Sequence, residues 1–351
     1  MLLYDYIKDG LKFKIAPLYL KDKIISDSVL GYSLNFTSPY KSPSEINNNV
    51  YAELFLKKEF FSQTPDIEVM DHKHIIEDFF KYYRKDIPIL VFLHGFSSKD
   101  EKLKHYYSFI NNILNIDNAC IFINLPFHLN RRPQSEASGN SIIYFDDIDT
   151  LLFFHQCVVD VRKAIDIVEK ILSPDEINIC GISLGSIVSV ISMAVDKRID
   201  KGIFLLGGGN WKEIHWNGIS RYILKGNCAG SEAITKEKCS IFYSNFSNFL
   251  EKMKESSPSI FTLELDGQEN LKNLCTKKCY LCDPLIFAHK IRTEKVLMIN
   301  SRFDHFFSKR SSLMLWEELG RPRILWFNYF HLSRILNKKL ILENVTSFLK
   351  K

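Results

Sequence analysis

The chain has 351 residues, of which 46% are hydrophobic and 25% charged, and it carries a formal net charge of +5. These proportions are typical of a globular protein, and the charge is too small to predict nucleic-acid binding. The length fits one large domain with an insertion, or two smaller domains.

Signals for a membrane or for secretion are weak. No stretch approaches the roughly 18 uninterrupted apolar residues of a membrane-spanning helix. Residues 1–10 lack the basic start and apolar centre of a signal peptide. Several of the eight cysteines lie within apolar runs, as in proteins of a reducing compartment. We therefore expect a cytoplasmic protein without a transmembrane segment.

The first part of the chain, residues 1–86, contains strand-like apolar runs at 29–36 and 50–56. We expect these runs to form antiparallel strands at one edge of a sheet. The sequence therefore predicts an N-terminal extension with edge strands, followed by a core domain over residues 87–350.

Within the core, apolar runs of strand length alternate with segments of helical spacing. The runs are 88–93, 119–125, 177–180, 202–206, 296–299 and 324–327. The helix-like segments are 102–114, 151–172, 184–196, 308–319 and 333–349. Unbroken apolar strands are buried on both faces, and repeated strand–helix units wind into a parallel sheet. The predicted fold class is therefore α/β, with a doubly wound, mostly parallel sheet.

One gap between core strands is too long for a single crossover helix. It covers residues 210–285, called here the inserted segment, and is rich in aromatic residues. Ligands in open α/β sheets bind at the carboxyl ends of the strands. We therefore expect an inserted cap over those ends, and a helical excursion elsewhere on the surface is the alternative.

A candidate nucleophile lies between an apolar run and an apolar helix-like segment. The pentapeptide Gly181-Ile-Ser-Leu-Gly185 has the G-x-S-x-G pattern and the strand–turn–helix context of a nucleophile elbow. Such a turn is sharp, so the residues two before and two after the serine must lack a Cβ. This pattern predicts Ser183 as the nucleophile, and an ordinary helix N-cap is the alternative reading.

With this elbow, residues 87–350 resemble the α/β-hydrolase superfamily, in which the triad runs serine, acid, histidine along the chain. The resemblance assigns Asp304, after the run 296–299, as the acid and His331, after the last run, as the base. Asp283 competes for the acid role, but its Asp-Pro context is more typical of a helix N-cap. The chain has nine other histidines that could act as the base. The alternative is that His331 is an ordinary surface histidine.

The resemblance also implies an oxyanion hole made of two backbone amides. One would be the amide of Leu184, which follows the nucleophile at a helix N-terminus. The other would come from the loop at 94–96, which reads His-Gly-Phe, and we expect the Phe96 amide, with Ser97 as the alternative. His94 is expected to shape this loop rather than to act as a second base.

The expected function is hydrolysis of a carboxylic ester or thioester through an acyl-enzyme on Ser183, without a cofactor. Aromatic residues of the inserted segment, Trp211 among them, indicate a small-molecule substrate with an apolar group. Arg131 and Arg132 resemble an Arg-Arg-Pro of uncharacterised abhydrolase-domain proteins and would present a fork to a substrate anion. The alternative is that they are solvated or pair with Glu136.

Other functions remain open at this stage. A peptidase or acyltransferase uses the same triad, and a catalytically silent scaffold can keep the same fold. Cys275, Cys279 and Cys282 have the spacing of an iron–sulfur site, but their position late in the chain favours isolated thiols and no metal. The sequence predicts neither the substrate nor the oligomeric state.

Overall fold

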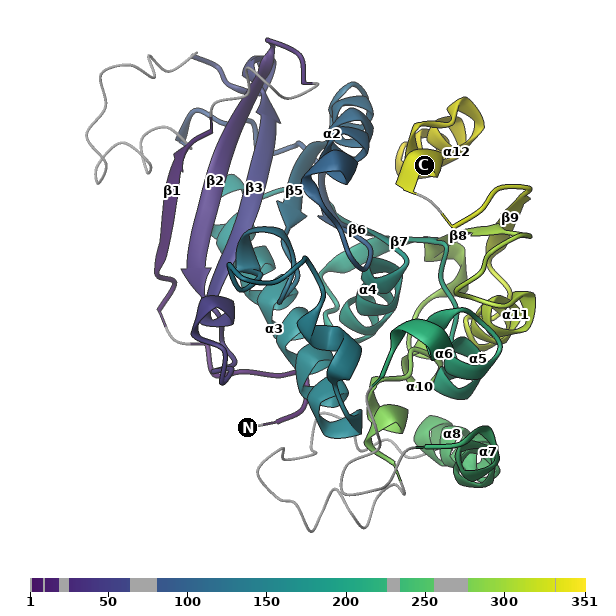
Figure 1. Ribbon diagram of the computed structural model, residues 1–351. Coiled ribbons are helices and arrows are strands. Elements are labelled where there is room, and N and C mark those ends of the chain that lie inside the picture. The colour runs from purple at the N-terminus through teal and green to yellow at the C-terminus, as the bar shows by residue number, and fades with distance from the viewer. Residues whose placement is uncertain are drawn as a thin grey trace.

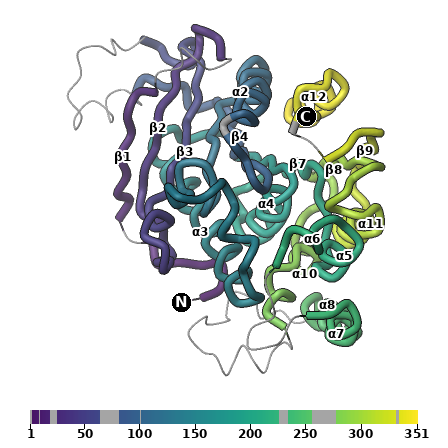
Figure 2. The backbone as a smooth tube through the Cα atoms, viewed as in Figure 1, coloured from purple at the N-terminus to yellow at the C-terminus, as the bar shows by residue number. Residues whose placement is uncertain are grey.

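The structure is a computed structural model that describes residues 2–8, 10–18, 25–63, 81–225, 234–255, 277–331 and 333–351. The described residues form a nine-stranded sheet that crosses the molecule from β1 at one edge to β9 at the other (Figures 1 and 2). Its strands are β1 (Phe13–Pro17), β2 (Val29–Thr37), β3 (Asn49–Lys57), β4 (Ile89–Leu93), β5 (Ala119–Ile123), β6 (Ile177–Ile182), β7 (Ile199–Leu205), β8 (Val296–Ser301) and β9 (Arg323–Phe327).

The sheet is parallel over most of its width. The strand order is β1-β2-β3-β5-β4-β6-β7-β8-β9. Strands β1, β2 and β3 pair antiparallel with each other, and β3 pairs antiparallel with β5. The remaining neighbours are parallel. The predicted α/β class with a mostly parallel sheet is confirmed. The runs at 29–36 and 50–56 form the antiparallel strands β2 and β3 on one side of the sheet, but the strand at that edge is β1, which was not predicted.

Helices cover both faces of this sheet (Figure 1). The longer ones are α2 (Asp100–Leu114), α3 (Asp147–Leu172), α4 (Leu184–Val195), α11 (Lys309–Glu318) and α12 (Lys339–Leu349). Side chains of β4 alternate between two cores: Val91 packs with α3 and α4, whereas Phe92 packs with α2 and α12. Strands that are apolar throughout are thus buried on both faces. No described helix has the length and apolar character needed to cross a membrane.

Two helix boundaries differ from the prediction by more than two residues. Helix α3 begins at Asp147 because the Asp146 carboxylate accepts hydrogen bonds from the first-turn N–H groups of Ile148 and Asp149, both at 2.8 Å. The first turn of α3 is polar and shows no apolar periodicity, so the sequence predicted a helix that begins only at residue 151. The expected helix over 333–349 is a 3₁₀ turn at Ser333–Asn337 followed by α12.

The described parts of the inserted segment are helical. They comprise α5 (Trp211–Trp216), α6 (Ser220–Ile223), α7 (Lys236–Tyr243), α8 (Phe246–Glu255) and a 3₁₀ turn at Lys278–Cys282, and α10 (Leu285–Ala288) follows. Helices α5 and α6 lie beside α11, and α7 and α8 lie farther from the sheet (Figure 1).

Asp283 joins the two ends of the inserted segment. Its side chain is fully buried. Its Oδ1 accepts hydrogen bonds from the N–H groups of Asn210 and Leu285, at 3.0 and 3.1 Å, and its Oδ2 accepts from Trp211 N–H at 2.9 Å. Burial raises the pKa of this carboxyl to about 6, although the three amides favour the charged form. One carboxylate therefore holds the exit from β7 against the start of α10.

This buried carboxyl predicts a pH-dependent stability. Because its folded pKa of about 6 exceeds the ordinary value of 3.8, the folded state binds the proton more tightly than the unfolded state. The stability that the proton supplies is lost as pH rises between these two values. The free energy of unfolding of the wild type relative to Asp283→Asn should therefore fall by roughly 2 kcal/mol from pH 4 to pH 7.

Urea unfolding of both proteins across this pH range measures the difference. Asp27→Asn, a change at an exposed side chain, is the matched control and should track the wild type at every pH. Parallel stability curves for the wild type and Asp283→Asn would contradict the prediction.

Candidate active site

Ser183 lies in a strained turn between β6 and α4. Its backbone has φ +57° and ψ −116°, a conformation that side chains other than glycine rarely adopt. A Cβ on Gly181 would lie 2.1 Å from the Gly185 carbonyl oxygen, and one on Gly185 would lie 2.4 Å from the carbonyl oxygen of Leu93. Both positions therefore require glycine. The turn lifts the serine to the edge where the parallel strands end.

Ser183, His331 and Asp304 are joined by hydrogen bonds. His331 Nε2 lies 2.7 Å from Ser183 Oγ, and His331 Nδ1 lies 2.7 Å from Asp304 Oδ2. A carboxylate only accepts, so Nδ1 carries the ring proton and Nε2 is left to accept the proton of the serine hydroxyl. Ser183 is the N-cap residue of α4 by position, but its side chain makes no capping hydrogen bond to the helix. Asp283, the competing acid, is bonded to amides at the base of the inserted segment instead.

Phe306 and Phe307 contact both Asp304 and His331. Their N–H groups donate to Asp304 Oδ1 at 2.8 and 2.9 Å. Their rings pack on the imidazole of His331, with centroids 4.7 and 5.8 Å away. Sequence reasoning missed these two residues. The signal that could have found them is the position of Asp304, two and three residues before this pair. At that spacing an aspartate carboxylate can accept hydrogen bonds from the N–H groups that follow it.

The loop after β4 is fixed by a buried histidine. The N–H of Leu125 donates to His94 Nε2 at 3.0 Å, so His94 Nδ1–H donates to the Gly95 carbonyl at 2.9 Å. Ser98 Oγ donates to the same carbonyl at 2.7 Å. The Gly95 carbonyl and the Phe96 N–H belong to the same peptide group, in which they point in opposite directions. Because His94 and Ser98 hold the carbonyl, the Phe96 N–H points away from both of them. A Cβ on Gly95 would lie 3.3 Å from that of Ser183, which places the loop beside the candidate nucleophile.

Burial also decides the protonation state of this histidine. The side chain of His94 is fully buried, and desolvation lowers its pKa well below the ordinary value. It is therefore neutral, with both ring nitrogens engaged by backbone groups. This arrangement fits the expected role of shaping the loop. Leu184, the other expected donor, is the first residue of α4, where backbone N–H groups have no acceptor within the helix.

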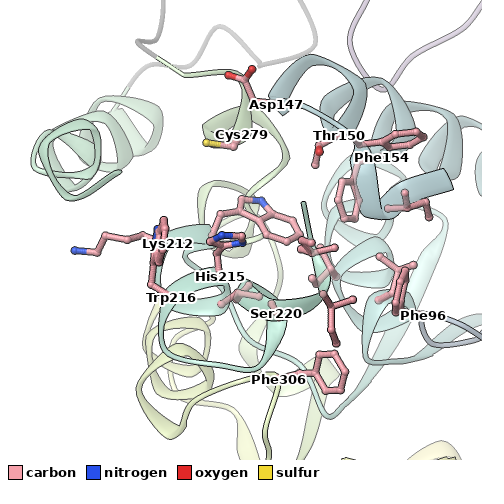
Figure 3. Close-up of a pocket in the computed structure, with 18 of the residues that line it drawn as sticks. Phe96, Asp147, Thr150, Phe154, Lys212, His215, Trp216, Ser220, Cys279 and Phe306 are labelled. Atoms are coloured by element: carbon pink, nitrogen blue, oxygen red, sulfur yellow. The ribbon is translucent and has the colours of Figure 1, made fainter. Parts of the chain in front are cut away.

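Ser183 lies in the wall of an apolar cavity of about 210 Å³. The walls come from α3 and the loop before it, from α4, from the loop after β8, and from the inserted segment. Most of the lining side chains are aromatic or aliphatic, among them Phe96, Phe154, Ile187, Trp211, Trp216 and Phe306. Figure 3 shows Phe96, Ser220 and Phe306 toward one end of this space and Asp147 and Cys279 toward the other. Trp211 thus lies at the cavity, where its expected role placed it.

Arg131 and Arg132 do not line this cavity. Arg131 is 1% exposed, and its guanidinium pairs with Asp160 at 2.9 Å and donates to the carbonyl groups of Asn124 and Asn47. Arg132 Nη1 donates to the Leu129 carbonyl at 2.8 Å. The prediction that these arginines bind a substrate anion is therefore wrong. Arg131 pairs with Asp160, a buried aspartate of α3, and neither arginine lines the cavity beside Ser183.

The three cysteines with the spacing of an iron–sulfur site lie in different surroundings. Cys279 lines the cavity, Cys282 is buried, and Cys275 lies outside the described residues. Within the part of the chain that the structure describes, no three histidine, cysteine or acidic side chains are grouped as metal ligands would be.

Comparisons with known proteins agree with this architecture. No protein-family model and no curated protein matches the chain. Among solved structures, an acetyl xylan esterase from Paenibacillus sp. R4 matches with a TM-score of 0.54 and 13% identity, over 97% of this chain and 89% of the other. Acetyl xylan esterase 1 from Thermoanaerobacterium sp. JW/SL YS485 matches with a TM-score of 0.53 and 14% identity, over 97% and 88%.

A third similar structure is a cold-adapted esterase from an Arctic intertidal metagenomic library, in a complex with PEG. It matches with a TM-score of 0.51 and 11% identity, over 94% of this chain and 96% of the other. At these identities the likeness concerns the fold. The chain has the α/β-hydrolase fold, as the resemblance of its sequence implied.

The placement of the two arginines generates a stability prediction. Arg131→Met leaves Asp160 charged and buried without its partner, which should lower the free energy of unfolding by about 3–5 kcal/mol. Arg132→Met is the matched control; it removes one hydrogen bond to a carbonyl and should cost roughly 1 kcal/mol. Adding Asp160→Leu to Arg131→Met should restore most of the loss.

Urea unfolding at neutral pH measures all three variants. Equal stabilities for Arg131→Met and Arg132→Met, together with a raised KM in either, would contradict the structural role and revive the substrate-binding one.

Proposed function

We propose that this protein is a serine hydrolase that cleaves a carboxylic ester or thioester through an acyl-enzyme on Ser183. The observation that carries the proposal is the continuous chain of hydrogen bonds from the serine hydroxyl through His331 to Asp304, with both distances at 2.7 Å. The strained turn at Ser183 and the esterases among the similar folds add support.

In the acylation half of the proposed reaction, Ser183 Oγ attacks the carbonyl carbon while His331 Nε2 accepts the hydroxyl proton. Asp304 stabilises the imidazolium that forms. The carbonyl oxygen becomes an oxyanion, which accepts hydrogen bonds from the amides of Leu184 and Phe96. When the tetrahedral intermediate collapses, His331 gives its proton to the leaving alcohol or thiol, and the acyl group stays on Ser183.

Deacylation repeats these steps with water as the nucleophile. His331 accepts a proton from water as the oxygen attacks the acyl carbon, and the same amides hold the second oxyanion. Collapse breaks the bond to Ser183 Oγ, which takes the proton back from His331. The products are the carboxylic acid and the free enzyme. Each proton transfer uses this chain's own residues, so the proposal requires no cofactor.

The cavity supports an apolar acyl group in the substrate. Its lining is dominated by aromatic and aliphatic side chains, so methylene groups that enter it leave water for an apolar environment. A peptide would bring buried amides that need hydrogen-bond partners, which such walls seldom provide. For this reason we favour an ester or thioester over a peptide. The segment 210–285, which contributes Trp211 and Ile214 to the walls, acts as the cap in this proposal.

The described cysteines support a reducing location. Cys120, Cys157, Cys180 and Cys282 are buried free thiols. Unpaired buried thiols are common in proteins of the cytoplasm, which we propose as the location.

The nucleophile is tested with a fluorophosphonate probe and a p-nitrophenyl ester. The wild type should label and turn over, whereas Ser183→Ala should not label and should lose activity by a factor on the order of 10⁴ or more. His331→Ala should lose a similar factor, and the double variant little more, because the residues act as one unit. The matched control is Ser247→Ala, at an exposed serine of α8, which should behave as the wild type.

Acidification gives a second readout of the same proposal, since an imidazolium cannot accept the serine proton. The activity of the wild type should therefore fall at acid pH. Equal labelling of Ser183→Ala and the wild type would contradict the proposal, and so would activity that does not change on acidification.

The apolar cavity predicts a dependence on acyl chain length. Each buried methylene contributes about 0.8 kcal/mol, which corresponds to a roughly fourfold increase in kcat/KM per carbon until the cavity is filled. A series of p-nitrophenyl esters from acetate to octanoate measures this slope. A matched series of alkyl acetates, in which the chain lies on the alcohol, should show a much shallower slope. Equal slopes in the two series would contradict the assignment of the cavity to the acyl group.

A further inference from the structure

We propose that the turn at Gly218–Ile219, between α5 and α6, positions the loop of Asp304 and couples filling of the apolar cavity to the alignment of His331. The inference rests on the proposed function and assigns a further positioning residue, Gly218, to the same reaction. It follows from how closely the inserted segment contacts the outer side of the loop after β8.

Backbone atoms of this turn lie against backbone atoms of the loop. The N–H of Ile219 donates to the carbonyl oxygen of His305 at 2.7 Å. A Cβ on Gly218 would lie 2.4 Å from the Phe306 carbonyl oxygen and 2.9 Å from that of His305. Real Cβ atoms essentially never approach so closely, so glycine is required here. Because backbone lies against backbone at Gly218, a displacement of the turn is passed directly to the loop.

The inner side of the same loop holds the proposed acid and base. The amides of Phe306 and Phe307 bind Asp304 Oδ1, and their rings pack on His331, as described above. The peptide whose carbonyl faces Gly218 is that between Phe306 and Phe307, and its N–H is one of the two donors to Asp304. A carbonyl pushed from outside therefore turns an N–H that orients the carboxylate.

The same structural elements form walls of the cavity. Helix α5 contributes Ile214, helix α6 contributes Ile223, and the loop contributes the rings of Phe306 and Phe307. Ser220, the first residue of α6, and Phe306 lie toward the same end of the cavity in Figure 3. An acyl chain long enough to touch α5 and α6 thus presses on the elements that support Asp304. Its binding energy is then expressed partly in the transition state, which raises kcat as well as lowering KM.

The test compares Gly218→Ala with Gly10→Ala, a control at which an added Cβ would meet no atom within 4 Å. Gly218→Ala should lower kcat for p-nitrophenyl octanoate by a factor on the order of 10–100, because small misplacements of catalytic groups are costly. Its KM should change less than threefold. The midpoint of the acid limb of kcat/KM should move to lower pH, because a displaced Asp304 stabilises the imidazolium less. A merely structural role would not move this midpoint.

A measurement that needs no turnover accompanies the kinetics. The proton between His331 Nδ1 and Asp304 is followed by NMR, and its resonance should move upfield or broaden in Gly218→Ala but not in Gly10→Ala. If the wild type neither labels nor hydrolyses esters while this resonance still responds, the proposed function fails and the positioning contact stands. If Gly218→Ala matches Gly10→Ala in kcat, acid limb and resonance, the inference is overturned.

The wild type supplies a further criterion that does not depend on a variant folding. Its kcat should rise along the series from acetate to octanoate. A constant kcat, with the whole effect of chain length in KM, would overturn the coupling between the cavity and the loop.

Discussion

The close approach of α4 to the ends of β4 and β6 determines where the Ser183 hydroxyl lies. At Gly185 the helix touches the carbonyl of Leu93, so a single missing side chain brings the end of β4 beside the turn. The loop that follows β4 is thereby brought against Ser183 at Gly95. One packing contact thus sets both the position of the hydroxyl and the position of the loop at Gly95 beside it. The strained backbone of Ser183 persists because its N–H is bonded to Leu205 on the neighbouring strand, at 2.8 Å.

The two histidines near Ser183 differ because their partners differ. His94 is buried, and both of its ring nitrogens are bonded to backbone groups. Its ring is therefore neutral and supports the loop after β4. His331 is partly accessible and bonded to a carboxylate on one side and a hydroxyl on the other. Only the second arrangement stabilises a transient positive charge while a proton is exchanged. The same type of side chain therefore gives a rigid support at His94 and a candidate base at His331.

Much of this arrangement was predictable because its signals are local or follow chain order. Apolar runs predicted the core strands. Gly181 and Gly185 predicted the sharp turn at Ser183, because residues with a Cβ do not fit at these two positions. Asp304 and His331 were found by their positions after the last strands, which a family resemblance fixes. Phe306 and Phe307 were missed because aromatic residues near a strand end are usually read as core. Their role depends on backbone amides, which every sequence contains.

Arg131 shows why charged residues are harder to interpret. Its partner Asp160 lies on α3, and nothing in the sequence distinguishes an aspartate that faces the sheet from one that faces water. The role of Asp283 was likewise only half visible. Its Asp-Pro context indicated a turn, but its bonds to Asn210 and Trp211 span the entire inserted segment and appear only in three dimensions.

That bridge at Asp283 has an evolutionary consequence. The start and the end of the inserted segment are both bonded to the Asp283 carboxylate. The length and composition of the residues between these points can therefore change while the sheet keeps its geometry. New substrate preferences could then arise by exchange of this segment alone, provided that a glycine still packs against the loop after β8.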